Sequence, residues 1–456
     1  MRRDRLLIVG LAAFFSGILI VAYSDVVANQ FAYFGFRNEH PGAGFVVLGF
    51  VLAVLPSLWI RPRVDRPSYL IFWLLYVFAY IPAQALPFFV VREPGVVVPW
   101  SLSLFVGLML MDRILVRRPR HTFQLASGGW PAWALVVPLL AVAYSFAARS
   151  GQLSIQAPSI GAAYVHRASY RLFLSRQGLA LGYLIPWTGN VLNPFLMSYG
   201  WVKRKLWWFA LGALGQIALY SLTGFKSVLL SPGFIVLIYV SLRRNGQNFG
   251  RDLLVACGGV TALALAAYWI VGNTFVIDII VARVFAVPGV LAGFHVEFFS
   301  SHPYTLFSDT FMKYFISPRY PLPTPFIIGD AYFGSTALSA NASLFVDGFA
   351  GLGPLGVVFI SVAAGVVLHM IDSAVASKDW RLMAGVFGIA GFTLANTALT
   401  TSLLTHGLLL ATVIGLLLPY GPGKSVARRR HQDHGEGQRH RLVGAAGSGS
   451  RQGGSL

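Results

Sequence analysis

The stretch that decides the fold lies at residues 68–90 and reads SYLIFWLLYVFAYIPAQALPFFV, without a single charged side chain. About 20 apolar residues are enough to cross the hydrocarbon core of a bilayer as an α-helix. Because hydrocarbon offers no partners to backbone N–H and C=O groups, a spanning segment is either a helix or part of a closed barrel. Barrel strands alternate in polarity over about 10 residues. This run does not alternate, so it predicts a transmembrane helix.

The composition of the whole chain agrees with this prediction. Hydrophobic residues make up 56% of the 456 residues and charged residues 11%, whereas an ordinary soluble domain has about 45–50% and about 25%. Apolar runs recur from residue 6 to residue 420. We therefore predict an all-α polytopic transmembrane bundle that forms one integral membrane domain over residues 1–421. The single cysteine, Cys257, excludes a disulfide framework and a cysteine-based zinc site.

Basic clusters at the ends of the apolar runs set the expected orientation and explain the net charge of +19 without nucleic acid. The positive-inside rule places these clusters in the cytoplasm. They lie at 2–5, 61–66, 113–120, 203–205, 243–251, 378–381 and 424–430. Two spans fit between successive clusters, which gives about twelve: about 6–23, 43–60, 68–90, 98–112, 130–147, 178–200, 207–222, 227–242, 253–272, 355–371, 383–399 and 403–420.

The two ends of the chain are both expected in the cytoplasm. No small-residue cleavage site follows the first apolar run, so we expect an uncleaved first helix. Residues 422–456 are rich in Gly, Arg, His and Ser without periodicity. Such a composition cannot bury a core, so we predict a disordered basic tail that can touch anionic membrane lipids.

Two outer segments are too long to be simple turns. The first, at about 148–177, contains Arg167, Arg171 and Arg176 and no acidic residue. In a helix Arg167 and Arg171 lie one turn apart on one face, and guanidinium groups bind phosphate oxygens bidentately. The segment therefore fits an anionic phosphate ligand. It fits equally an amphipathic helix at the membrane surface whose arginines reach the lipid headgroups.

The second outer segment, at about 273–354 before the tenth span, holds most of the ionisable residues outside the predicted cytoplasmic clusters. Their concentration on one side predicts a site that faces the periplasm or the exterior, above a scaffold of apolar spans. Its prolines and aromatic residues fit stacking on sugar rings, and also fit simple contact with a membrane surface.

Several chemistries find no support in the sequence. There is no phosphate-binding loop of the Gly-x-x-x-x-Gly-Lys-Ser/Thr type and no Asp-x-Asp pair, so neither nucleotide hydrolysis nor metal-dependent transfer from a nucleotide sugar is expected. The predicted spans carry almost no charge at mid-depth. Ion-coupled transporters usually keep charged groups there.

A series of short motifs resembles the oligosaccharide repeat unit polymerases, which build O-antigen and capsular polysaccharide in bacteria. The motifs are TGFKS at 223–227, RVFAVPG at 283–289, FFSSHP at 298–303, IGDAYF at 328–333, NASLFVDGFA at 341–350 and GPLG at 353–356. The resemblance covers about 200–375 and lies in the order of the motifs. At the position where the family usually has an asparagine, before the final glycine-rich element, this chain has Gly351.

The resemblance implies a membrane glycosyltransferase of the bacterial inner membrane with its active site outside the cytoplasm. The enzyme would transfer a growing glycan from its polyprenyl pyrophosphate carrier to another lipid-linked repeat unit, with no metal or other cofactor. A chain-length regulator and a flippase are the expected partners. That reaction requires cations for the departing pyrophosphate and a base for the acceptor hydroxyl.

Each of these roles has candidate residues. For the pyrophosphate they are Arg167, Arg171, Arg176, Lys226 and Arg283. For the base they are His295 and Glu297, and for the sugar hydroxyls Arg319, Asp330, Asn341 and Asp347.

Three alternatives stay open at this point. A glycosyltransferase that uses a polyprenyl monophosphate sugar would take Asp25, just after the first apolar run, as its acid-base residue. An O-antigen ligase would share the basic outer surface. A glycan flippase would perform no bond chemistry, and would be expected to carry charge inside its spans.

Overall fold

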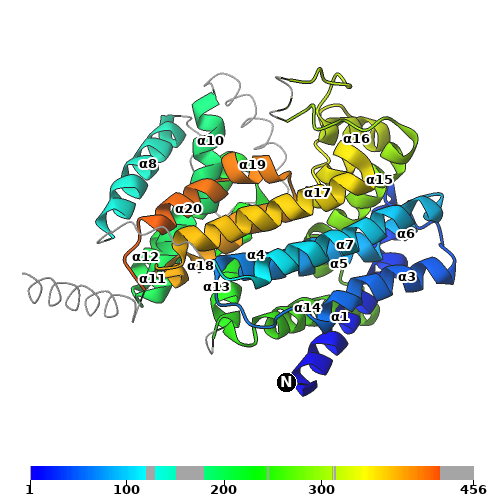
Figure 1. Cartoon of the computed structure of the whole chain (residues 1–456), viewed down its shortest axis with the longest axis horizontal. Helices are drawn as coiled ribbons and strands as arrows, with labels where there is room; N and C mark the ends of the chain where they lie inside the picture. The colour runs from blue at the N-terminus through cyan, green and yellow to red at the C-terminus, as the bar shows by residue number, and fades with distance from the viewer. Residues whose placement is uncertain are drawn as a thin grey trace, which may run out of the picture.

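The computed structural model describes residues 2–119, 129–149, 179–243, 246–310, 312 and 315–421, and within these residues every regular element is a helix (Figure 1). Up to residue 149 the helices, with η marking π- and 3-10 segments, are α1 (Arg2–Ala22), η1 (Tyr23–Val27), α2 (Ala28–Gln30), η2 (Ala32–Phe34), α3 (Ala43–Val54), η3 (Leu55–Leu58), α4 (Pro67–Leu75), η4 (Tyr76–Tyr80), α5 (Ile81–Ala85), α6 (Pro87–Val90), η5 (Pro94–Val96), α7 (Val97–Val116) and α8 (Trp130–Arg149).

The second half continues with α10 (Leu179–Trp187), η6 (Thr188–Leu192), α11 (Asn193–Val202), α12 (Leu206–Thr223), α13 (Lys226–Ser241), α14 (Phe249–Val271), η8 (Ile277–Ala286), α15 (Val287–Ser301), α16 (Thr324–Phe333), α17 (Leu344–Val375), η10 (Trp380–Met383), α18 (Ala384–Phe392), η11 (Thr393–Ala395), α19 (Leu399–Leu404) and α20 (Leu408–Leu416).

Eight helical stretches among the described residues are long and apolar enough to cross a membrane, which confirms the all-α class and indicates a membrane-embedded protein. They are Asp4–Gln30, Pro67–Val90, Pro94–Val116, Trp130–Arg149, Leu206–Thr223, Phe249–Val271, Ile277–Ser301 and Leu344–Val375. Seven of them coincide with predicted spans. Three other predicted spans fall on shorter apolar helices, namely Ala43–Leu58, Lys226–Ser241 and Trp380–Ala395.

The stretch at Ile277–Ser301 is helical, although the sequence predicted an outer loop region over 273–354. It spans 25 residues over η8 and α15, and its most apolar 18-residue window has a mean hydropathy of 1.9. Asp278, Arg283 and Glu297 are spread along it, and these charges obscured the apolar run between them. The helix of the next span also begins earlier than predicted, at Leu344 rather than 355.

The helix Pro67–Val90, whose sequence predicted the fold, lies at the centre of the bundle. Its side chains are buried throughout. Around it, α17 runs beside α7 (Figure 1), where a Cβ on Gly107 would lie 2.5 Å from Ser361 Oγ. Such close approach of small residues is how helices associate in lipid, where no hydrophobic force acts between them.

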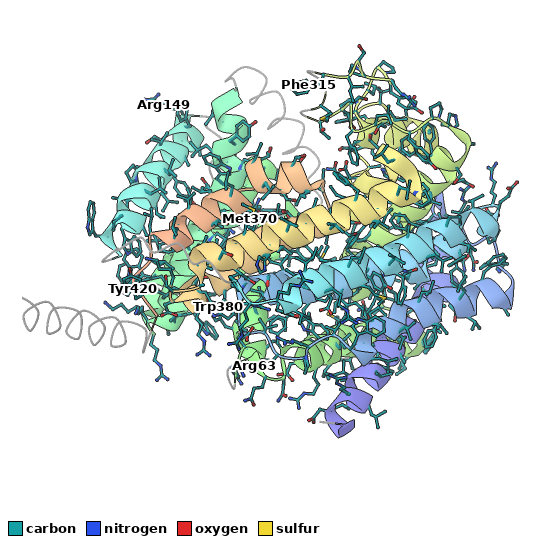
Figure 2. All side chains as sticks on the ribbon, in the orientation of Figure 1. Arg63, Arg149, Phe315, Met370, Trp380 and Tyr420 are labelled. Carbon is teal, nitrogen blue, oxygen red and sulfur yellow. The ribbon has the colours of Figure 1, made fainter. Side chains whose placement is uncertain are left out.

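The residues labelled in Figure 2 fall into groups at the two ends of the bundle. Figure 2 shows Arg63, Trp380 and Tyr420 in the lower half of the view, and Arg149 and Phe315 at the top. The charge pattern assigns the same two groups to opposite sides of the membrane.

Candidate functional site

Glu297, on the last turns of α15, is the centre of a polar cluster built from distant parts of the chain. Its carboxylate forms an ion pair with Arg37, which lies between η2 and α3. The backbone N–H of Arg92, between α6 and η5, donates to Glu297 Oε1 at 3.0 Å. We call Arg37, Arg92, Glu297 and Tyr332 the Glu297 cluster. One-fifth of the Glu297 side chain is exposed, so the carboxylate is held in place and still accessible.

Arg37 is fixed by several contacts besides the ion pair. Its Nε donates to the carbonyl oxygen of Val90 at 2.6 Å, and its own carbonyl accepts a bond from the Tyr23 hydroxyl at 2.8 Å. Glu39 lies 3.5 Å from the same Nε. These bonds tie the first connection of the chain to the ends of α6 and α15, and they orient Glu297.

Aromatic rings form a platform beneath the guanidinium of Arg37. The Arg37 guanidinium carbon lies 5.3 Å from the ring centre of Phe294 and 5.8 Å from that of Tyr332. These two rings are stacked, with centres 4.5 Å apart. Phe333 extends the platform, since it lies edge-on to Phe294 and 6.0 Å from Phe34. Phe294 is 1% exposed, so the ring surface open to a ligand comes from Tyr332 and Phe333, which are only partly buried.

Tyr332 contributes a phenol as well as a ring. Burial raises the pKa of the Tyr332 phenol, the neighbouring Glu297 carboxylate raises this pKa further, and Arg37 and Arg92 lower it. The net direction is upward, so the phenol keeps its proton and is available as a hydrogen-bond donor beside Glu297.

Arg283 reaches the other end of the platform. Its guanidinium carbon lies 5.9 Å from the ring centre of Phe34. Arg283 belongs to the π-helical segment η8, which contacts two other π-helical segments, η1 and η4. Such segments carry an extra residue per turn and occur often at functional sites, because they turn a side chain away from the regular helical register.

Asp25, the acid-base residue of one alternative, lies in the π-helical segment η1. It is exposed and lines a cavity of about 440 Å³ together with Asn29, Gln30, Tyr268 and Thr274. The residue before Asp25 contacts the first connection, since Asn38 Nδ2 donates to the carbonyl oxygen of Ser24 at 3.5 Å.

His295, the other candidate base, is placed differently. Its side chain is 2% exposed, and its Nδ1 lies 2.7 Å from the carbonyl oxygen of Leu291, one helical turn earlier. That bond makes Nδ1 the protonated nitrogen and leaves Nε2 in the interior. Two residues along a helix point to nearly opposite faces, so His295 turns into the core where Glu297 turns out of it. The geometry favours Glu297 as the base.

The predicted sugar-binding residues lie on elements near α15 but do not converge on Glu297. Asp330 is exposed on α16, two residues before Tyr332. Arg319 donates to the carbonyl oxygen of Tyr304 at 3.1 Å. Asn341 accepts a bond from Ser339 at 3.0 Å, and Asp347 lies in the first turn of α17.

The remaining predicted cations are elsewhere. Lys226 begins α13, next to Val228, which packs in a separate apolar cluster with Ala147, Ile185, Leu219 and Leu222. Arg167, Arg171 and Arg176 lie outside the described residues.

A break in α17 explains the glycine at position 351. Leu352 and Gly353 leave helical geometry, and the carbonyl oxygens of Ala350 and Gly351 accept bonds from the backbone N–H groups of Thr305 and Leu306. A Cβ on Gly351 would lie 2.5 Å from the Phe307 ring. An asparagine, which the polymerase family usually has here, does not fit beside that ring.

Sequence reasoning missed Arg37, Arg92 and Tyr332 as members of the site. A signal for the two arginines was present, because each stands in a predicted outer connection where the positive-inside rule disfavours arginine.

Comparison of the chain with protein-family models, with curated proteins and with solved structures finds no match in any of the three. The likeness to the repeat unit polymerases therefore rests on the short motifs and their order.

Proposed function

We propose that this chain is a membrane glycosyltransferase that polymerises polyprenyl-pyrophosphate-linked oligosaccharide repeat units outside the cytoplasm. The observation that carries the proposal is the Glu297 cluster: an accessible, oriented carboxylate beside an aromatic platform, with Arg283 at the far end of that platform. Three of the motifs shared with the polymerase family contribute to it or flank it. RVFAVPG contains Arg283, IGDAYF contains Tyr332, and FFSSHP directly follows Glu297.

The proposed reaction assigns one task to each part. Glu297 accepts the proton of the acceptor sugar hydroxyl as its oxygen attacks the anomeric carbon of the donor glycan. The bond between that carbon and the pyrophosphate oxygen breaks, and the pyrophosphate carries away the electron pair. Arg283 stabilises the departing charge, a contribution of roughly 3 kcal/mol for a strong donor in a partly desolvated site. Arg37 is committed to Glu297 and acts as a positioning residue.

The experiment that tests this proposal uses the purified protein and a lipid-linked repeat unit. We expect a ladder of longer lipid-linked glycans, which Arg283→Ala shortens while the protein level stays normal. Absence of any product longer than the substrate would refute polymerase activity. Transfer of the glycan from its lipid carrier to a lipid A core acceptor would identify a ligase instead.

Orientation is tested separately by labelling with a membrane-impermeant maleimide. The chain is well suited to this because Cys257 is its single cysteine and is buried. In a Cys257→Ala background we expect Glu93→Cys to react from outside the cytoplasmic membrane and Arg63→Cys only after permeabilisation. The opposite pattern would place the Glu297 cluster on the cytoplasmic side and overturn the proposal.

The cavity at Asp25 favours a second candidate, a glycosyltransferase that uses a polyprenyl monophosphate sugar. In that case Asp25→Asn abolishes transfer and Glu297→Gln does not. The repeat unit polymerase predicts the reverse.

A further inference from the structure

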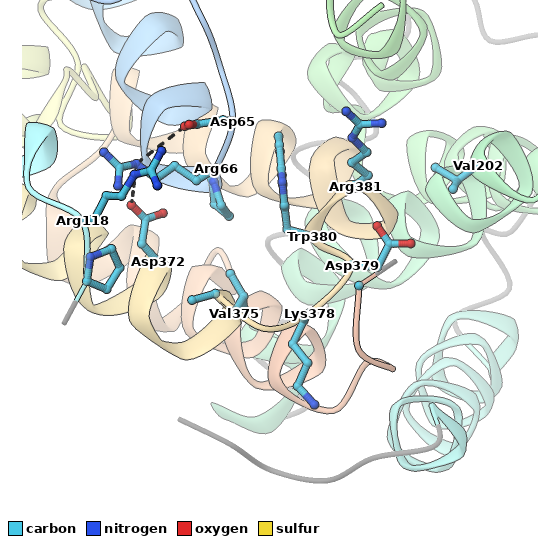
Figure 3. A pocket seen from close by; sticks show the side chains of 14 residues that line it. Asp65, Arg66, Arg118, Val202, Asp372, Val375, Lys378, Asp379, Trp380 and Arg381 are labelled. Carbon is cyan, nitrogen blue, oxygen red and sulfur yellow. Dashed lines mark ion pairs between the residues drawn. The ribbon is translucent and has the colours of Figure 1, made fainter. Parts of the chain in front are cut away.

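A second polar site lies at the opposite end of the bundle from the Glu297 cluster. It is a cleft of about 760 Å³ between the connection that precedes α4, the end of α7 and the connection that follows α17 (Figure 3). The basic clusters 61–66, 113–120 and 378–381 contribute to its lining, and Val202, directly before the cluster 203–205, does so as well. The charge pattern therefore puts the cleft at the cytoplasmic surface of the membrane.

One ion pair inside the cleft is already complete. The carboxylate of Asp372 is 1% exposed, lies 3.3 Å from Arg66 Nε, and accepts bonds from both the backbone N–H and the hydroxyl of Ser68. Arg66 also lies over the ring of Tyr69, 5.0 Å from its centre. This pair fixes one wall, and Arg66 Nε also lies 3.9 Å from the carboxylate of Asp65.

The other charged groups of the lining favour an anion. They are Arg118, Lys378 and Arg381 against Asp65 and Asp379, a net charge of one positive. Arg118 is exposed and makes no hydrogen bond or ion pair with any residue in the described part of the chain. Figure 3 shows Arg66 and Arg118 on one side of the cleft, Arg381 on the other, and Trp380 between them.

The opposite wall of the cleft is formed by the connection that follows α17 and by the residues that follow α20, and backbone hydrogen bonds join the two. The backbone N–H of Asp379 donates to the carbonyl oxygen of Pro419, and that of Gly421 donates to the carbonyl oxygen of Ser377. The Lys378 ammonium lies 4.6 Å from the ring centre of Tyr420. The two connections are thus held together, and the cleft is formed before any ligand enters.

We propose that this cleft binds the phosphate of an anionic phospholipid headgroup, with Arg118 as its main contact. A guanidinium group binds phosphate oxygens through two parallel hydrogen bonds. Among the lining residues Pro67, Pro119, Val202 and Val375 are apolar and suit the glycerol and upper acyl chains. Trp380 is of the type that gathers at membrane interfaces, and basic pockets between helix ends on the cytoplasmic side recognise anionic headgroups. This inference does not depend on the proposed glycosyl transfer.

The test compares two neighbouring arginines in the purified full-length protein. Arg117 is exposed and belongs to the same cluster, but it does not line the cleft. Retention of phosphatidylglycerol and of zwitterionic phosphatidylcholine is measured by native mass spectrometry. We expect the wild type to prefer phosphatidylglycerol, Arg118→Gln to reduce that preference roughly fivefold, Arg118→Lys to keep only part of it, and Arg117→Gln to preserve it.

Two results would overturn the proposal. Equal losses in Arg118→Gln and Arg117→Gln would show a general surface attraction without a site. Displacement of phosphatidylglycerol by inorganic phosphate, with the same dependence on Arg118, would show a site for a soluble anion. Thermal unfolding of each variant checks that the exposed substitutions leave the fold intact.

Discussion

Replacement of Glu297 by glutamine separates catalysis from stability at the proposed site. Glutamine has the shape of glutamate and keeps one oxygen for the backbone N–H of Arg92. It removes the charge that pairs with Arg37 and the ability to accept a proton from a hydroxyl. The side chains of Glu297 and Arg37 are 20% and 22% exposed, so water compensates part of the lost pairing. We therefore expect the free energy of unfolding to fall by only about 1 kcal/mol.

The expected effect on the reaction is larger. A general base contributes about 10²–10⁴-fold to a rate, which corresponds to about 3–5 kcal/mol of activation free energy. The assay follows the rate at which the ladder of lipid-linked products appears, and thermal unfolding of the same samples measures stability. A rate that falls at least a hundredfold, with only a small shift of the unfolding temperature, is the predicted result.

The chain offers a matched control at Glu39. This carboxylate lies 3.5 Å from the same guanidinium and its side chain is 34% exposed. Glu39→Gln therefore makes the same change of charge beside Arg37 without touching the proposed base, and its rate should stay within about threefold of the wild type. Equal losses in the two variants, or a Glu297→Gln enzyme that keeps most of its rate, would refute the role given to Glu297.

Three further predictions follow from particular contacts. His295→Leu should leave the polymerisation rate within about threefold of the wild type, because within the described residues the buried imidazole bonds only to the backbone of its own helix. A hundredfold loss in the same assay would instead make His295 the base. Gly351→Ala should lower the unfolding temperature, at a cost of about 1–3 kcal/mol for the clash with Phe307. Adding Phe307→Leu should recover part of that loss, and an unchanged single variant would contradict the geometry. Asp372→Asn should destabilise the protein by about 3–5 kcal/mol, because Arg66 loses its closer and buried charged partner and keeps only Asp65, 3.9 Å away. The double variant with Arg66→Gln should be less unstable than the single one, as measured by denaturation in detergent.

The helical class was predictable because hydropathy is a local property. The run at 68–90 needs no knowledge of its neighbours to predict a membrane helix, and it became the buried centre of the bundle. Hydropathy alone also reveals the helix at Ile277–Ser301, since its most apolar 18-residue window has a mean hydropathy of 1.9. The charged residues Asp278, Arg283 and Glu297 outweighed that window in the prediction of an outer loop region.

The site was predictable only in part. The sequence nominated Arg283 and Glu297 from motifs, and both lie at the aromatic platform. It could not separate Glu297 from His295, since the two stand two residues apart and only the packing of α15 decides which one faces inward.

By itself the sequence determined that the backbone folds as apolar helices, since long uncharged runs in hydrocarbon can satisfy their hydrogen bonds in no simpler way. Tertiary structure alone decided which polar groups meet. Arg37 and Glu297 are 260 positions apart, and Ser68 and Asp372 are 304 apart. Contacts over such separations depend on how whole helices pack against one another, and no local pattern of residue types records that packing.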